Sequence, residues 1–95
     1  MAKSTAYDPY YRLAAALIAH AIKSARRVDQ PTTHEMRVSA LKAIEWLASP
    51  RLAHQWFDLA GFEYEALVGR LPLGRWIERG NELLTDDADL RKAVG

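Results

Sequence analysis

Residues 49–71, SPRLAHQWFDLAGFEYEALVGRL, decide the fold that this sequence is expected to adopt. Apolar residues recur every three or four positions on both sides of Gly61, as in amphipathic α-helices. Ser49 and Pro50 predict a helix start, since serine can accept hydrogen bonds from first-turn amides and proline at the first helical position gives up an amide that has no partner. We expect Gly61 to end this helix and a short second helix to follow over about residues 63–70. The stretch therefore predicts a helix-turn-helix-like pair.

The segment before this pair predicts two longer helices. Asp8 and Pro9 repeat the cap-and-proline signal and indicate a helix over about residues 9–28. Thr32, with Glu35 three residues later, fits a capping box, in which each side chain bonds the other residue's backbone amide. A second helix is therefore expected to begin at this box and to lead into the central pair.

The segment after the pair predicts one helix over about residues 74–84 and a last turn, capped by Thr85 or Asp86, that reaches residue 94. No stretch of the chain alternates apolar and polar residues over the length of a strand. The sequence therefore predicts an all-α fold.

Size and composition indicate a single compact bundle. The chain has 95 residues, of which 49% are hydrophobic and 26% charged, values that are ordinary for a folded domain and unlike those of a disordered chain. We expect one helical domain over residues 1–95, built of five to six short helices around one modest core, with residues 1–7 and 86–95 as loose ends.

The expected compartment follows from what the sequence lacks. It has no cysteine, which excludes disulfides, thiolate metal ligands and cysteine nucleophiles. The first residues do not follow the order of a signal peptide, and the longest apolar run, LAAALIA, is too short to cross a bilayer. We expect a soluble, cytoplasmic protein without a membrane partner. Because the formal net charge is only +1, a local patch must select any charged partner.

Patterns typical of catalysis or metal binding are not found. His20, His34 and His54 fall on three different predicted helices, and we expect none of them to take part in a helical metal site. Ser49 and Thr32 are explained by helix caps, and the glycines are too scattered to form a phosphate-binding loop. We therefore expect a protein that is not an enzyme and that uses no metal or cofactor.

The 9–28 helix presents the first candidate surface for partner binding. At roughly 100° per residue, one side of the helix gathers the side chains expected to enter the core, which are Leu13, Ala14, Leu17, Ile18, Ala21, Ala25 and Val28. The other side combines small alanines, which would let a partner approach closely, with the basic side chains of Arg12, His20, Lys23, Arg26 and Arg27. The alternative is that this basic side is merely solvated.

A second candidate surface lies on the central pair and the segment after it. It consists of charged residues predicted to be exposed, namely Asp58, Glu63, Glu65, Arg70 and Arg75. Its acidic members could meet a basic surface of a partner, whereas an ordinary solvated rim is again the alternative.

The helix-turn-helix outline makes a DNA-binding regulator an alternative function. Leu67 supplies the apolar residue that such units place after the turn, but Phe57 is bulky where they typically have a small residue. Glu63 and Glu65 would repel phosphates at the start of the helix that would enter the groove. Direct DNA binding is therefore disfavoured, and a homodimer is left open.

The string AIEWLAS at residues 43–49, followed by LAGFEY at residues 59–64 and by Leu67 and Val68, resembles small helical proteins encoded by tailed phages and prophages. These carry an A-x-x-W-[LI]-x-S segment ahead of an A-G-apolar-acidic block. The resemblance implies a mobile-element setting, in which small proteins regulate phage genes or bind and block host machinery, including CRISPR defence complexes.

On this basis we expect a non-enzymatic, phage-type protein in the cytoplasm of a bacterial host. It would dock on a host protein or nucleoprotein complex and inhibit or modulate it, in the most concrete form as an anti-CRISPR-like inhibitor. A helix-turn-helix transcriptional regulator and a virion or DNA-packaging component are the two alternatives.

Overall fold

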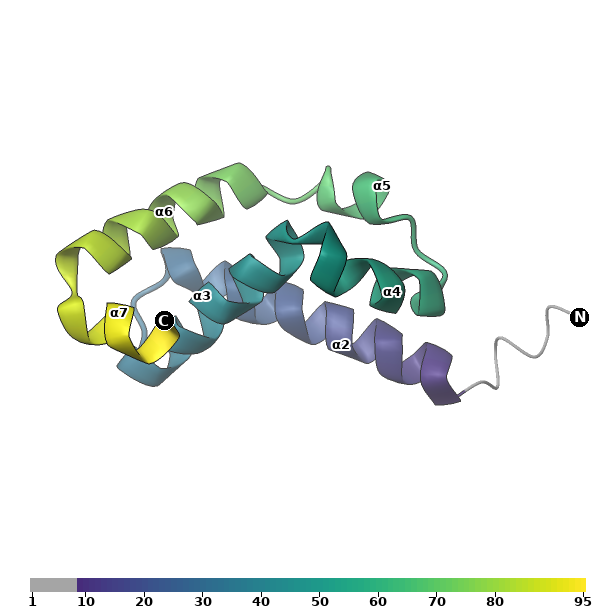
Figure 1. The fold of residues 1–95 in the computed structure, drawn as a ribbon, viewed down its shortest axis with the longest axis horizontal. Helices are drawn as coiled ribbons and strands as arrows, with labels where there is room; N and C mark the ends of the chain where they lie inside the picture. Colours follow the sequence, from purple (N-terminus) through teal and green to yellow (C-terminus); the bar gives the residue numbers. More distant parts are fainter. Residues whose placement is uncertain (1–8) are drawn as a thin grey trace, which may run out of the picture.

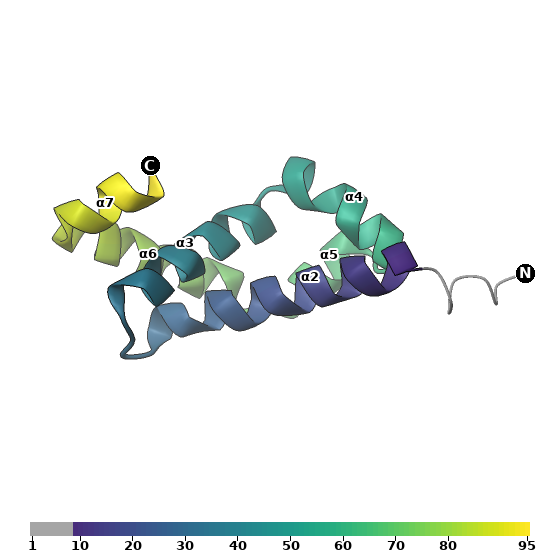
Figure 2. The ribbon, with the colours of Figure 1, turned by 90° about the horizontal axis from the view of Figure 1, so that it is seen from below.

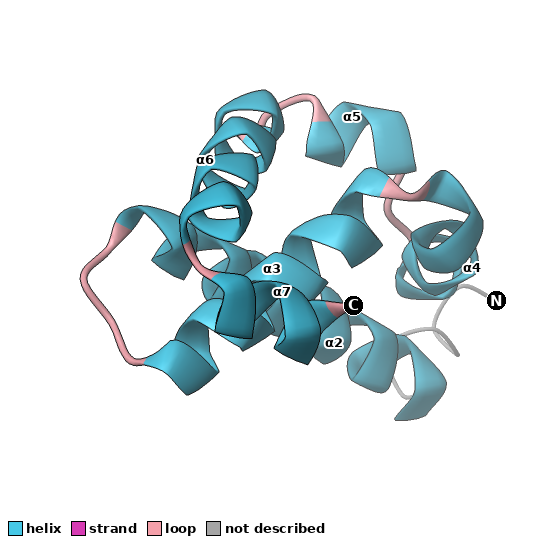
Figure 3. Cartoon of the chain, turned by 60° about the vertical axis from the view of Figure 1, so that its left-hand side comes forward, coloured by secondary structure: helices cyan, strands magenta, loops and turns pink. Residues whose placement is uncertain are grey.

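The computed structural model describes residues 9–95, so the predicted cap Asp8 and the predicted loose end 1–7 lie outside the described residues. Within residues 9–95 every regular element is helical, which confirms the all-α fold (Figures 1 and 3). None of these helices combines the length and apolar character needed to cross a bilayer. The elements are α2 (Pro9–Arg26), the 3₁₀ turn η1 (Arg27–Asp29), α3 (His34–Ala48), α4 (Pro50–Ala60), α5 (Tyr64–Val68), α6 (Leu73–Asp86) and α7 (Ala88–Val94).

The bundle is organised around α2, its longest helix. Both Figure 1 and Figure 2 show α3 running back along α2 in the opposite direction, and α4 continuing past α3 toward the start of α2. α2 makes its most extensive contacts with α3 and α4. α5 and α6 then return toward the far end of the molecule, where α7 lies against α3 and α6.

The contact face of α2 is built mostly from alanine. Ala14, Ala21 and Ala25 are buried together with Ile18 and Val28, as predicted. Small side chains let α3 and α4 approach closely, and they also narrow the strip of α2 that is covered. The two predicted core leucines at the margin of this strip stay outside: Leu13 is 55% and Leu17 is 37% exposed, so that part of the prediction is wrong.

The start of α3 differs from the predicted capping box by one residue. Thr33, not Thr32, occupies the N-cap position, and its hydroxyl oxygen accepts a hydrogen bond from the Met36 amide at 3.2 Å. The Thr32 hydroxyl instead donates to the thioether sulfur of Met36. Two consecutive threonines offer the same capping group, and the spacing to Glu35 favoured the wrong one.

The turn at Gly61 confirms the central prediction. Gly61 has a φ of 80°, and it is the left-handed residue that ends α4. Its amide donates to the Asp58 carbonyl at 3.1 Å, while the Phe62 amide donates to the Phe57 carbonyl at 2.9 Å. This pair of bonds is the Schellman pattern, which satisfies carbonyls that the end of a helix leaves free. Pro50 begins α4 as predicted, although the Ser49 side chain makes no capping bond.

The last helix has a different cap from the one predicted. Asp87, rather than Thr85 or Asp86, caps α7 by accepting from the Leu90 amide at 3.1 Å. Polar composition made residues 86–95 look like a loose end, yet α7 forms there and buries Leu90 completely.

α7 is also fastened to the end of α6 by one side chain. The Arg91 guanidinium donates to the carbonyls of Leu84 and Thr85 at 2.8 and 3.3 Å. These carbonyls belong to the last turn of α6, where no helical amide follows to pair with them. A side chain of α7 therefore supplies hydrogen bonds to carbonyls at the end of α6.

The contact between α3 and α6 depends on one glycine. Gly80 is buried on α6, and a Cβ atom placed there would lie only 2.8 Å from Leu41 Cδ2 on α3. A side chain at position 80 would therefore require the Leu41 side chain to shift.

Candidate partner-binding surface

The outer face of α2 and the start of η1 carry five basic residues. Arg12, His20, Lys23 and Arg26 are exposed, and Arg27, in η1, is half-buried. At about 1.5 Å per residue these side chains cover about 22 Å along the helix. The five residues of the first candidate surface thus lie together, and we refer to them as the basic face.

Within residues 9–95 no acidic group pairs with the arginines or the lysine of the basic face. α2 contains no aspartate or glutamate. Within residues 9–95 the structure forms no ion pair with Arg12, Lys23, Arg26 or Arg27. Exposed single pairs add little to affinity, but an array of like charges produces a field that attracts an oppositely charged surface. The basic face can therefore select an acidic partner in a chain whose net charge is close to zero.

The residues of the second candidate surface make separate contacts with different parts of the structure. Asp58 pairs with His54 on the same helix at 3.1 Å, and Arg75 reaches Asp29 of η1 at 3.3 Å. Glu63 and Arg70 line one shallow hollow of about 180 Å³ beside α5. All five residues of the second surface are exposed, but they combine both charge signs. Its acidic members, Asp58, Glu63 and Glu65, are all exposed, and their role in partner contact stays a prediction.

The central pair is held by an aromatic contact instead of a helix-turn-helix core. Phe57 is fully buried, and its ring meets that of Tyr64 edge-on at 5.1 Å between centroids, with the Trp46 ring at 6.3 Å. The Tyr64 hydroxyl donates to the Leu47 carbonyl at 2.5 Å, near the end of α3. Burial, with a smaller contribution from Glu65, raises the pKa of Tyr64 above its ordinary value.

α5 is short for a helix that would read DNA. It spans five residues, against the predicted range 63–70, and buries none of them completely. Tyr64 fixes its first turn to α3, and exposed Glu63 and Glu65 stand at the same end. The side chains that would reach a DNA groove first are therefore acidic.

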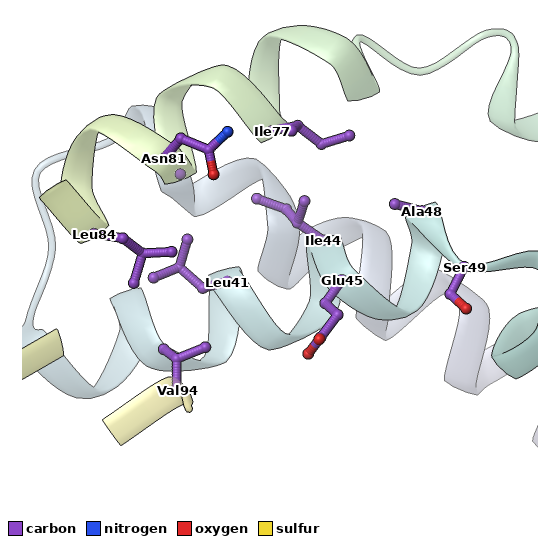
Figure 4. A pocket seen from close by; sticks show the side chains of 10 residues that line it. Leu41, Ile44, Glu45, Ala48, Ser49, Ile77, Asn81, Leu84 and Val94 are labelled. Atoms are coloured by element: carbon purple, nitrogen blue, oxygen red, sulfur yellow. The ribbon is translucent and has the colours of Figure 1, made fainter. Parts of the chain in front are cut away.

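An apolar hollow lies between α3, α6 and α7. It measures about 310 Å³, and Leu41, Ile44 and Leu84 turn toward one another within it (Figure 4). Figure 4 places Glu45 and Asn81 on opposite sides of the hollow. Because these polar groups do not converge on one point, the hollow offers no arrangement for acid–base or nucleophilic chemistry.

Groups that could hold a metal ion are not brought together in residues 9–95, where no cluster of three or more His, Asp or Glu side chains forms. His54 and Asp58 approach each other on one exposed turn of α4, but two groups fall short of the ligand sets of protein zinc sites.

Comparison of the chain with protein-family models, with curated proteins and with solved structures found no match. The fold and surface define an all-α protein with a basic helix face whose arginines and lysine form no ion pair within residues 9–95, and its function has to be inferred from that face.

Proposed function

We propose that this protein is a non-enzymatic binding protein that docks through the basic face of α2 onto an acidic surface of a protein or nucleoprotein complex. The observation that carries the proposal is the exposed, unpaired array from Arg12 to Arg27 on elements that run along the length of the bundle. Docking by contact would alter the partner's activity by covering its surface.

The setting we propose is that of a phage-type protein acting on host machinery, with an anti-CRISPR-like inhibitor as its most concrete form. The support for this setting is the resemblance of residues 43–68 to small phage proteins. A rigid helix with small residues between its cations, such as exposed Ala16 and Ala19, suits a blocking role because it lets a partner surface approach closely.

A DNA-binding regulator receives less support from the geometry. The turn at Gly61 has the right form, but α5 is one and a half turns long and acidic at its first turn. We therefore rank protein or nucleoprotein docking above base reading by α5. A virion or packaging component would predict a defined homo-oligomer, which light scattering measures.

The test is capture from a bacterial host lysate, followed by mass spectrometry. The wild-type protein is compared with Arg26→Glu/Arg27→Glu and with the control Arg51→Glu/Lys92→Glu, which reverses two exposed charges on α4 and α7. We expect the wild type and the control to capture the same partner and Arg26→Glu/Arg27→Glu to lose it. Equal capture by all three removes the basic face from consideration.

Two further measurements complete the test. Circular dichroism and thermal unfolding establish that both charge-reversed proteins remain folded. A gel shift over a range of salt concentrations addresses DNA: specific binding of a duplex at physiological salt would favour the regulator over our proposal.

A further inference from the structure

A hollow between α2 and α3 lies directly beside the basic face. Its volume is about 310 Å³, and His20 belongs both to its wall and to the basic face. Eight residues line it: Leu17, His20, Ala21 and Ser24 from α2, and Ser39, Lys42, Ala43 and Trp46 from α3. The walls are apolar, with two hydroxyl groups and two basic groups among them.

Ser24 supplies an unused hydrogen-bonding group in this hollow. It is only 5% exposed and is the one buried polar residue in the part of the chain whose burial the structure describes. Its hydroxyl forms no hydrogen bond with any other residue of 9–95. None of the described side chains has a sealed oxygen without a partner, so the unpaired Ser24 hydroxyl reaches solvent, and an acceptor that enters the hollow could replace water there.

The ionisable residues that line the hollow are both basic. His20 and Lys42 are its only ionisable residues, neither forms an ion pair within residues 9–95, and no carboxylate lines the wall. Leu13 and Leu17 expose apolar surface on the same side of α2. The region therefore matches a partner segment that has an apolar anchor flanked by carboxylates.

We propose that this hollow receives a tyrosine side chain from an acidic amphipathic helix of the partner protein. The ring would pack against Leu17, Ala43 and Trp46, and the phenolic oxygen would accept a hydrogen bond from Ser24. Carboxylates on the same partner helix would lie near Lys42 and the basic face. This inference rests on the proposed function, since it specifies the partner that the basic face attracts.

A second copy of this chain is a poorer occupant. A symmetric contact through this hollow would bring Lys42 of one copy near Lys42 of the other, and like charges facing each other across an interface are repulsive. The chemistry of the hollow thus favours an acidic helix from a different protein.

The probe is a capped helical peptide of alanine and glutamate with one central tyrosine. It is titrated into the isotope-labelled protein while the backbone amides are followed by NMR. We expect shifts to concentrate at Ser24, Ser39, Ala43 and Trp46. A peptide with lysine in place of every glutamate should bind at least about tenfold more weakly, because it presents the wrong charge to Lys42 and the basic face.

A double-mutant cycle tests the hydrogen bond itself. Replacing the peptide tyrosine by phenylalanine should weaken binding to the wild type about 3- to 10-fold, as expected for loss of one buried hydrogen bond. The same replacement should have no effect on binding to Ser24→Ala, a change that suits a helix. An equal effect of the replacement on both proteins overturns the assignment of Ser24.

A third test fills the hollow with a bulky side chain. Ser39 is exposed at its edge, so Ser39→Trp should occupy the space without disturbing the core, and Ala93→Trp on α7 is the matched control. We expect Ser39→Trp to abolish peptide binding and Ala93→Trp to retain it. Three results of the titration would each overturn the proposal: unchanged binding by Ser39→Trp, equal binding of the lysine peptide, or NMR shifts centred elsewhere. The proposal would also be overturned if the wild-type protein forms dimers that Ser39→Trp does not form.

The two proposals fail in different ways. If a lysate partner is lost with Arg26→Glu/Arg27→Glu but retained by Ser39→Trp, the basic face stands and the hollow does not. If the acidic peptide binds in the hollow but charge reversal leaves lysate capture unchanged, the anchor site stands and the proposed function fails.

Discussion

Replacing Phe57 by alanine should be among the most destabilising single changes in this protein. Phe57 is fully buried, and its ring is the contact between α4, Trp46 of α3 and Tyr64 of α5. Truncation of a buried phenylalanine costs about 3–5 kcal/mol. We place Phe57→Ala toward the upper end, because the edge-on contact with Tyr64 adds about 0.5–1.5 kcal/mol beyond burial.

The assay is urea unfolding followed by circular dichroism, which separates a change in midpoint from a change in slope. Phe62 is a natural control, because it lies in the same turn region and is 39% exposed. Phe62→Ala should cost well under half as much. At about 4–8 °C per kcal/mol for a domain of this size, Phe57→Ala should also lower the melting temperature by more than about 12 °C.

One result would refute this reasoning. If Phe57→Ala costs less than about 1 kcal/mol, or no more than Phe62→Ala, the site collapses around alanine and the Phe57 ring does not hold α4 against α3 and α5. A small residue at this position is what a helix-turn-helix unit prefers, so that outcome would also restore the DNA-binding alternative.

Three further changes test single contacts. Above pH 10.0, the ordinary tyrosine pKa, the free energy of unfolding should fall with rising pH, because Tyr64 loses its proton in the unfolded chain while its raised pKa keeps the proton in the folded chain. Unfolding measured over the same pH range should show no such fall for Tyr64→Phe, and this substitution should cost about 0.5–1.5 kcal/mol at neutral pH. Gly61→Ala should cost about 1–2 kcal/mol in urea unfolding, since φ is 80°, and an equal or higher midpoint would contradict this. Asp87→Ala should cost about 1 kcal/mol through loss of the α7 cap, whereas Asp89→Ala, which caps nothing, should cost much less; matching midpoints would exclude the cap.

Much of the fold was predictable because its signals are local. The 3.6-residue periodicity, Pro50 and Gly61 each act over a single turn, and all three led to elements that the structure contains. The helix boundaries were less certain for the same reason: Thr32 and Thr33 are equivalent caps until the rest of α3 fixes which amide is free.

Tertiary packing explains what the sequence did not predict. Leu13 and Leu17 lie at the edge of an apolar stripe, and whether such residues are covered depends on the angle at which α3 and α4 cross α2. A last turn reaching residue 94 was predicted, but the packing of α7 was not, because its burial rests mainly on one leucine, Leu90, which gives no periodic signal in a polar segment of this length.

The candidate surface likewise has one part that the sequence predicts and one part that depends on tertiary packing. The exposure of Arg12, His20, Lys23 and Arg26 follows from a helical wheel, because these residues lie opposite the alanine contact face. The hollow depends on how α2 and α3 face each other, which no local pattern determines. Its one sequence signal was Ser24, a polar residue beside the buried positions Ala21 and Ala25.

The way α7 is attached has a consequence for the order in which the bundle opens. A seven-residue helix is too short to be stable alone, so α7 exists only while Leu90 is buried and Arg91 holds the end of α6. Its amides should therefore exchange with solvent through a small local unfolding event, well before α2 and α3 do. Since Val94 lines the apolar hollow of Figure 4, each such event would briefly uncover Leu41 and Leu84.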